Sequence, residues 1–476
     1  MRLRNFATLA VVAAGAALSA CSAVGPDYVA PQGPAVHAAA FEAVRPDALS
    51  SDPLPPHWWR LYDNAQLDTL VAEALRVNSD LRVVLANLER ARAEAEEARA
   101  AYGVQAAVDA GVSVGQASTQ GIGPSTGTHG VVNAGLGIAY EVDVAGRIRR
   151  ALEAVDASAQ ARQSAYELAQ VTVAAGVVSA YTDACAAGAR LKVARQSVAL
   201  QRQSLALTAR GASAGIYSTR DTLRSETLLA QLEAVVPPLE GARRTALYNL
   251  AVLTGHPPTE FPPALAQCET MPALSRPLPV GDAAGLIRRR PDIRRAEREL
   301  AAATAVIGVK TAGLYPTVTL GANLGTIFRM GTEPFSGAAL QYGLGPVISW
   351  SFPNHRVARA RIDEASATAR AALAQFDGTV LNALREAESA LTLYVRHLEE
   401  NERLRLARDA SLAAALVEQR LAAGGTVSGL ERLDTERTLA IAEGALAASD
   451  ATLASDRVRI FLALGGGWEA TARPLE

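Results

Sequence analysis

Four segments alternate strictly between apolar and small or polar residues, and this period of two constrains the fold more than any other feature. They form two pairs, within residues 104–145 and 316–352. Alternation over ten or more residues gives a β-strand one apolar and one polar face. A soluble, half-buried sheet would explain one such strand. Four long strands in an otherwise helical chain instead predict strands that cross a membrane, with the apolar face toward lipid and the polar face toward a lumen.

Four strands are too few to close a membrane barrel on their own. The smallest transmembrane barrels have about eight strands, and an open sheet edge does not persist in hydrocarbon. We therefore expect the chain to oligomerise so that several copies complete one barrel. The strands themselves leave two, three or more copies open.

Long helix-forming stretches follow each strand pair, over residues 146–210 and 357–423. At 1.5 Å per residue, each helix would be roughly 95 Å long. Glycine-rich breaks near 211–217 and 424–429 predict the tips of two helical hairpins. In the first return helix, Pro237-Pro238 predicts a kink or a break.

The same order of elements occurs twice, which predicts two structural repeats over residues 61–257 and 281–468. Each repeat begins with a helix of about 25 residues, for which Asn78 is the expected N-cap in one case and Pro291 the expected first residue in the other. We assign residues 258–280 to a linker and residues 469–476 to a C-terminal tail. The fold class is a mixed α/β membrane protein.

The N-terminus has the pattern of a secretory signal peptide over residues 1–20: Arg2 and Arg4 precede a short apolar run. Leu18-Ser19-Ala20-Cys21 resembles a bacterial lipobox. The resemblance implies cleavage between Ala20 and Cys21, an S-diacylglycerol and an N-palmitoyl chain on Cys21, and, because Ser22 follows, sorting to the outer membrane. Residues 21–60 would be the lipid-anchored segment. No stretch approaches the roughly 18 or more uninterrupted apolar residues that are typical of a membrane-spanning helix.

Two other cysteines remain, Cys185 and Cys268. A periplasmic location permits a disulfide. Because the two lie in segments predicted as helix and linker, we expect free thiols, and the sequence leaves their pairing open.

The residues give little sign of catalysis. The six histidines show no metal-ligand spacing, and no nucleophile motif is present. Gly121-Ile122-Gly123 lies between predicted strands and not before a helix, so it is a poor phosphate loop. A net charge of -2 gives no reason to expect nucleic-acid binding. We predict no enzyme activity, no metal and no cofactor apart from the covalent lipid.

Several motifs in the same order resemble the TolC-like outer-membrane factors, specifically the OprM/NodT lipoprotein branch. The resemblance covers essentially the whole mature chain. It is carried by Val24-Gly25-Pro26-Asp27-Tyr28, Trp58-Trp59, Tyr140 to Arg147, Arg288 to Glu297, Leu314-Tyr315-Pro316 and Leu464 to Trp468. The sequence departs from the family at Ala145 and at Phe352 to Arg356, which puts the local geometry of two strand-to-helix joins in doubt.

The resemblance implies a homotrimer in the outer membrane, with a 12-stranded β-barrel continued by a periplasmic α-helical barrel. Such a channel passively conducts small molecules, such as drugs and toxic organics, that an inner-membrane pump, of the RND type, and a periplasmic adaptor deliver. A type I protein-secretion duct uses the same fold and remains the alternative. A diffusion porin or a lipidated adaptor fits the combination of strands and long helices less well.

The resemblance also assigns roles to individual residues. Gly215 and Gly425 fall at the tips where relatives meet the adaptor, although a turn alone would favour glycine. Glu431 and Asp434 occupy the positions of the periplasmic aperture, with Asp221 and Arg220 in the corresponding stretch of the first repeat. An ordinary solvated helix face is the competing interpretation of these charges.

Overall fold

The computed structural model describes residues 23–31, 41–42, 45–115, 127–274, 276–350, 355–423 and 429–466. The chain divides into two compact units. The sheet unit comprises residues 1–32, 87–163 and 295–376, and the hairpin unit comprises residues 33–86, 164–294 and 377–476. The predicted lipidation site Cys21, its cleavage partner Ala20 and the second-tip residue Gly425 lie outside the described residues.

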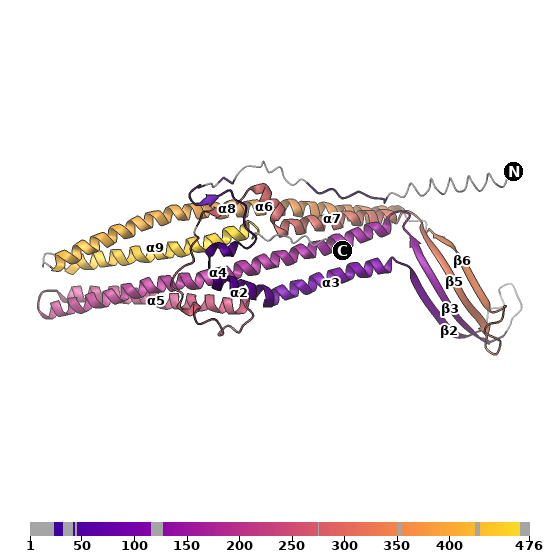
Figure 1. The fold of residues 1–476 in the computed structure, drawn as a ribbon, viewed down its shortest axis with the longest axis horizontal. Coiled ribbons are helices and arrows are strands. Elements are labelled where there is room, and N and C mark those ends of the chain that lie inside the picture. Colours follow the sequence, from indigo (N-terminus) through magenta and orange to yellow (C-terminus); the bar gives the residue numbers. More distant parts are fainter. Residues whose placement is uncertain are drawn as a thin grey trace. The chain divides into compact units, whose positions relative to one another are not determined.

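The sheet unit contains one antiparallel four-stranded sheet with the order β2-β3-β5-β6 (Figure 1). Its strands are β2 (Gln105–Gly115), β3 (His129–Val142), β5 (Thr317–Arg329) and β6 (Leu340–Ser349). All four lie inside the two predicted segments, so the strand prediction is confirmed. The pairing of β3 with β5, which joins the two hairpins into one sheet, was not evident from the sequence.

Four helices connect directly to this sheet. α3 (Ser79–Ala101) leads into β2, and α7 (Pro291–Ala312) leads into β5. β3 leads into α4 (Arg147–Ser213), and β6 is followed by α8 (His355–Ala423). The predicted helix starts are confirmed: Asn78 Oδ1 accepts a hydrogen bond from the backbone N–H of Leu81 at 3.1 Å, and Pro291 is the first residue of α7.

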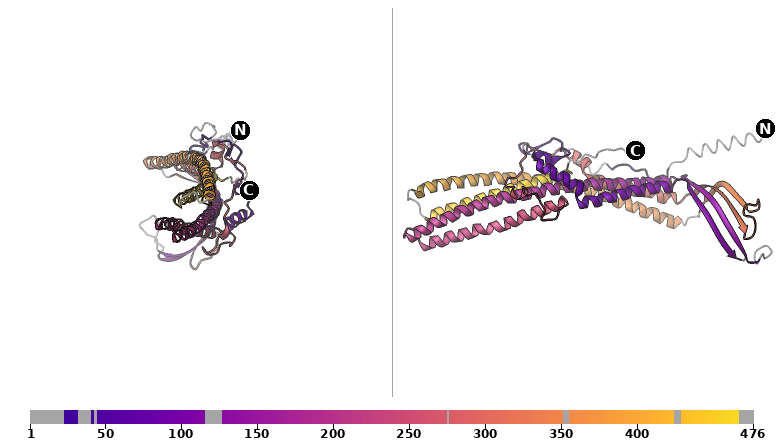
Figure 2. Two further views of the ribbon diagram at one scale, coloured as in Figure 1. Left: turned by 90° about the vertical axis from the view of Figure 1, so that its left-hand side faces the viewer. Right: turned by 60° about the horizontal axis from the view of Figure 1, so that its bottom comes forward.

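Each long helix returns through a partner helix, which gives two helical hairpins (Figure 2). α5 (Thr219–Leu253) pairs with α4, and α9 (Gly429–Ala463) pairs with α8. Of the predicted kink or break at Pro237-Pro238, the break is wrong, because α5 runs through both prolines without interruption. Both prolines are exposed. Water can therefore bind the carbonyl groups that lose their N–H partners, so the helix need not end there.

α4 contains an apolar window that is long enough to cross a membrane by length and composition alone. Within the structure, 78% of that window is buried. The window is therefore part of the helical core, where Ala174, Val177 and Val178 are almost fully enclosed.

The rest of the hairpin unit consists of short elements around the middle of these helices. Trp58 of the 3-10 helix η1 (Trp58–Tyr62) stacks on Phe461 of α9, with ring centroids 4.3 Å apart, and both side chains are fully buried. The remaining described elements are α2 (Ala65–Val77), α6 (Ala283–Arg289), η2 (Leu265–Gln267) and the paired short strands β1 (Leu49–Ser50) and β4 (Leu278–Pro279).

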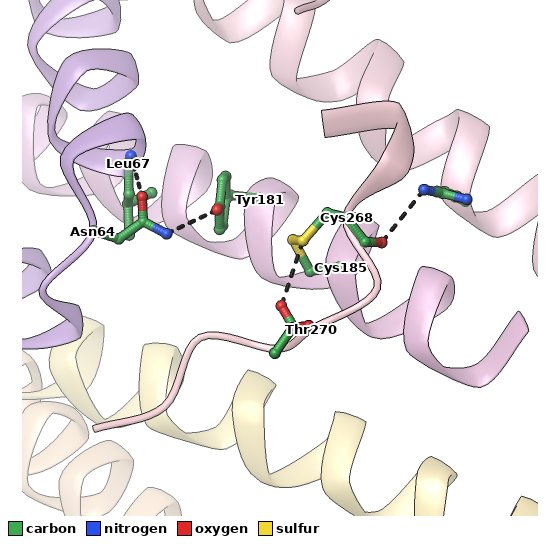
Figure 3. The surroundings of a disulfide bond; sticks show 7 residues. Asn64, Leu67, Tyr181, Cys185, Cys268 and Thr270 are labelled. Atoms are coloured by element: carbon green, nitrogen blue, oxygen red, sulfur yellow. Dashed lines mark hydrogen bonds between the residues drawn. A yellow bond between two sulfur atoms is a disulfide. The ribbon is translucent and has the colours of Figure 1, made fainter. Parts of the chain in front are cut away.

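A disulfide joins Cys185 of α4 to Cys268 of the linker, with Cα atoms 4.9 Å apart (Figure 3). The expectation of free thiols is therefore wrong. The linker crosses α4 closely enough that a Cβ at Gly188, one turn beyond Cys185, would overlap the carbonyl oxygen of Cys268. The Arg243 guanidinium of α5 donates to the same carbonyl at 3.3 Å. Neither the crossing nor these contacts can be read from the spacing of the two cysteines.

Candidate functional site

One face of the sheet is a continuous apolar surface. The strand register places Val108, Leu136, Leu324 and Tyr342 in one row across all four strands. Their exposed fractions are 80, 44, 54 and 82%. Soluble monomers rarely expose a contiguous apolar patch of this extent. The row is suited to contact with hydrocarbon.

The opposite face carries small and polar residues. In the adjacent row, Ala107, Gly137, Asn323 and Gly343 face one another in register. Small side chains leave the space above this face free of bulky groups. The face can therefore line a passage for solutes without supplying a specific binding pocket.

Both edge strands, β2 and β6, have a strand neighbour on one side only. An apolar sheet with unpaired N–H and C=O groups along two edges cannot be stable in lipid unless those edges are paired. Within the described chain, no further strand is available to pair them. Strands from other copies can supply the missing pairs.

The segment that follows the predicted lipidation site packs against the joins between strands and helices. Val24 N–H donates to the Ala145 carbonyl at 3.0 Å, and the buried Arg150 guanidinium pairs with Asp27 at 2.5 Å. Tyr28 donates to Glu297. Glycine is also needed where this segment crosses α7, because a Cβ at Gly25 would lie only 2.5 Å from the Gly308 Cα. The Val-Gly-Pro-Asp-Tyr motif thus fixes the position of residues 24–28.

The first hairpin tip is a tight turn completed by a helix cap. Gly215 has φ +74°, a left-handed conformation that favours glycine. Ser218 and Asp221 then form a capping box at the start of α5. The hydrogen bonds from Ser218 hold the pKa of Asp221 below its usual range. Asp221 thus has a local structural role, and within the described residues Arg220 forms no ion pair.

Glu431 and Asp434 are exposed and lie near the start of α9. Residues three apart on a helix share a face, so the two carboxylates are neighbours. The intervening residues point the other way: Leu433 is buried, and the side chain of Arg432 is only 18% exposed. This placement is compatible both with the predicted aperture and with an ordinary solvated helix face.

Arg432 connects the two hairpins. Its Nη2 donates to Ser204 Oγ at 3.0 Å and to Thr208 Oγ1 at 3.3 Å, both on α4. Its Nε lies 3.6 Å from Glu436 Oε1 on the next turn of α9. Burial is the largest cause of the raised pKa of Glu436, and Glu418 of α8 raises it further. Three helices therefore meet at one partly buried polar cluster.

Sequence reasoning missed this cluster. Arg432 stands between Glu431 and Asp434 in the sequence and was not among the predicted site residues. The helical period places Arg432 roughly 160° around the helix from Asp434, away from the middle of the acidic face, and that signal could have separated it. Among the described residues, no group of three or more His, Cys, Asp or Glu side chains could hold a metal ion.

The family model described as "Outer membrane efflux protein" matches residues 70–256 and 285–466, more than half of the chain. The chain belongs to this family. Nodulation protein T from Rhizobium leguminosarum bv. viciae is 30% identical over 454 residues, covering 95% of this chain and 92% of the relative. The antibiotic efflux pump outer membrane protein ArpC of Pseudomonas putida is 29% identical, covering 95% and 93%.

Among solved structures, the outer-membrane channel OprN is similar, with a TM-score of 0.87 and 36% identity. The alignment covers 94% of this chain and 99% of OprN. The resemblance to TolC-like outer-membrane factors of the OprM/NodT branch is thereby confirmed. As an outer membrane efflux protein, the chain belongs in the outer membrane and acts in export, which agrees with the two faces of its sheet.

Proposed function

We propose that this outer membrane efflux protein is the passive exit duct of a tripartite efflux system and works as a homotrimer. The observation that carries the proposal is the sheet, which combines an apolar face, a polar face of small residues and two unpaired edges. Three copies would contribute twelve strands, enough for a closed barrel that encloses a water-filled lumen. The two helical hairpins of each copy would continue the duct.

The domain organisation follows from this role. Residues 1–20 would be removed as a signal peptide, and Cys21 would carry S-diacylglycerol and N-palmitoyl chains. The same order of helix, strand pair and helical hairpin in both halves supports two structural repeats, 61–257 and 281–468, around the linker 258–280. The packing of residues 24–28 on the strand-to-helix joins would hold the lipid anchor close to the barrel.

The partners are a periplasmic adaptor at the hairpin tips, near Gly215 and Gly425, and an inner-membrane pump of the RND type. Small polar residues on the lumen face carry little specificity, so the pump would select the exported small molecules. Efflux outer membrane relatives such as ArpC support small-molecule export over protein secretion.

Reconstitution in planar bilayers tests the duct. The purified protein should form heat-sensitive oligomers and conduct ions passively. A water-soluble monomer without conductance would exclude the proposal. Photo-crosslinking in cells from Gly215, with the exposed Arg244 as a control position on α5, should then capture an adaptor only from the tip.

The aperture has its own test. Three copies of Glu431 and Asp434 would place six carboxylates around one constriction, and such acidic rings favour cations. Replacing both residues by alanine should raise conductance and lower cation selectivity. Glu399→Ala and Glu400→Ala on α8 remove the same charge as a control. Unchanged conductance and selectivity in the Glu431→Ala/Asp434→Ala variant would reject the aperture assignment.

A further inference from the structure

Every helix that connects to the sheet carries basic residues at the end nearest the sheet. In α3 and α7, which lead into strands, this is the C-terminal end, with Arg99 and Lys310 in the last turn. In α4 and α8, which follow strands, it is the N-terminal end. α4 begins with Arg147, Arg149 and Arg150, and α8 begins with His355-Arg356 followed by Arg359 and Arg361.

The helix dipole explains only half of this pattern. Cations are favourable at a helix C-terminus, as in α3 and α7, but unfavourable at an N-terminus. α4 and α8 have no acidic residue in the first turn. The other described α-helices longer than α6 all have one: Asp68, Asp80, Asp221, Asp292 and Glu431. At the starts of α4 and α8, the sign of the charge thus follows nearness to the sheet and not helix direction.

Some of these cations have partners within the protein. Arg147 pairs with Glu141 at 2.7 Å, Arg150 pairs with Asp27, and Arg99 pairs with Asp156. Within the described residues, four others are exposed and form no ion pair. These four, which we call the basic collar, are Arg149, Lys310, Arg359 and Arg361.

Among the described residues, no acidic group forms an ion pair with the collar, although α3 also carries Glu96 and Glu97 near the sheet. Glu141 lies on the small-residue face, in register with Thr319, and is paired with Arg147. The Asp143 carboxylate accepts hydrogen bonds from the backbone N–H groups of Ile148 and Arg149. On α8, Asp363 and Glu364 come after the arginines, further along the helix from the sheet.

Aromatic residues mark the same end of the sheet. Tyr140 lies near the end of β3, Tyr315 just before β5 and Trp350 just after β6, with 43, 49 and 52% of their surfaces exposed. Tyrosine and tryptophan gather where a membrane meets water. Along the chain, the order is therefore apolar strand face, aromatic residues and then unpaired cations. This order matches the layers of a membrane leaflet, from its hydrocarbon core to its phosphate groups.

We propose that the basic collar binds the headgroups of anionic phospholipids in the membrane leaflet that faces the helices. The inference rests on the proposed function, because it needs the apolar sheet face to lie in the membrane. Each cation near an anionic surface favours binding by about fivefold, so four give an effect on the order of several hundred-fold. The collar would fix how deep the sheet sits in the bilayer.

Lipid binding by the intact oligomer tests the proposal. Native mass spectrometry with added phosphatidylglycerol or phosphatidylethanolamine should show that the wild type prefers phosphatidylglycerol, and that salt weakens this preference. The variant R149Q/K310Q/R359Q/R361Q should lose most of the preference. The control R210Q/R244Q/R403Q/R420Q removes the same charge from exposed, unpaired arginines in the hairpin unit and should keep it.

Equal preference in the wild type and the collar variant would overturn the proposal, as would a wild type without preference. A shift in ion selectivity with unchanged lipid preference would also overturn it and place the arginines along the duct. If the fourfold variant fails to assemble, R149Q/K310Q and R359Q/R361Q are measured separately, each with an expected loss of about 25-fold. Bilayer conductance separates the two hypotheses, because a wild type that forms no channel would refute the proposed function itself.

Discussion

The two helical hairpins are nearly equal in length but are held in place differently. α4 and α8 have 67 and 69 residues, and α5 and α9 have 35 each. In the first hairpin, the Cys185–Cys268 disulfide ties α4 covalently to the linker. The described part of the second hairpin contains no cysteine. It is held by polar contacts such as His397 Nδ1 to Asp456 Oδ2, 2.5 Å apart, and Asn401 Nδ2 to Asp450 Oδ1, at 2.8 Å.

This difference suggests a division of roles between halves with the same order of elements. A covalent tie does not yield to the forces that rearrange a channel, whereas side-chain contacts can break and re-form. We therefore expect rearrangement at the periplasmic end to displace α8 and α9 relative to α4 and α5. The Arg432 cluster, which joins α9 to α4, is one of the contacts that such a movement must break.

Removing the disulfide should have the largest effect on stability. The disulfide closes a loop with a sequence separation of 83 residues. By loop-closure entropy, Cys185→Ser/Cys268→Ser should lower the free energy of unfolding by about 4.5 kcal/mol. Guanidinium unfolding followed by circular dichroism measures this loss of unfolding free energy. Reductant should destabilise the wild type similarly and leave the variant unchanged. An unchanged midpoint in the variant would show that the linker is held without the bond.

The second half should depend most on Arg290. This buried guanidinium pairs with Asp292 at 2.7 Å and Glu386 at 2.9 Å, and donates to the Ala463 carbonyl at the end of α9. Arg290→Ala removes the hydrogen bonds from this buried guanidinium to all three groups and should cost about 3 kcal/mol of unfolding free energy. Arg288→Ala, at an exposed neighbouring position, is the matched control. Similar losses in both variants would contradict the special role of Arg290.

The contact between the hairpins should be weaker. Arg432→Leu removes charged hydrogen bonds to Ser204 and Thr208, worth about 2 kcal/mol. If these bonds hold α9 against α4, the variant should show a higher open probability in single-channel recordings. Arg437→Leu, at an exposed site on the same helix, should not. Identical gating in both variants would mean that the cluster is not broken during opening.

The smallest expected effect is a pH dependence at Glu436. Burial raises the pKa of this carboxyl, so the folded protein binds the proton more tightly than the unfolded chain does. The contribution to stability is therefore fully present below the unfolded pKa of about 4.3 and is lost as the pH rises through the folded pKa. Compared with Glu436→Gln, the wild type should gain stability as the pH falls from about 7 to about 4.5. Parallel pH profiles of the two unfolding free energies would show that Glu436 does not titrate differently in the folded state.

Local signals in the sequence predicted much of the molecule. Strand alternation, the Asn78 cap, Pro291 at a helix start and the turn at Gly215 each depend on neighbouring residues. The backbone conformation of a cap or turn, and the alternation of apolar and polar residues in a strand, each depend on only a few neighbouring residues. Such features can therefore be predicted from the sequence. The predicted break at Pro237-Pro238 failed for a related reason: the cost of a proline depends on whether water reaches the carbonyl groups it leaves unpaired.

By itself, the sequence determined the amphipathic strands, the long helices and, through its motifs, the family. Only the tertiary structure decided which strands pair across the two halves, that Cys185 meets Cys268, and that Arg432 leaves the acidic face to contact α4. These contacts join residues far apart in the chain. They depend on how α4, the linker and α9 pack together, and no local pattern of residues encodes that packing.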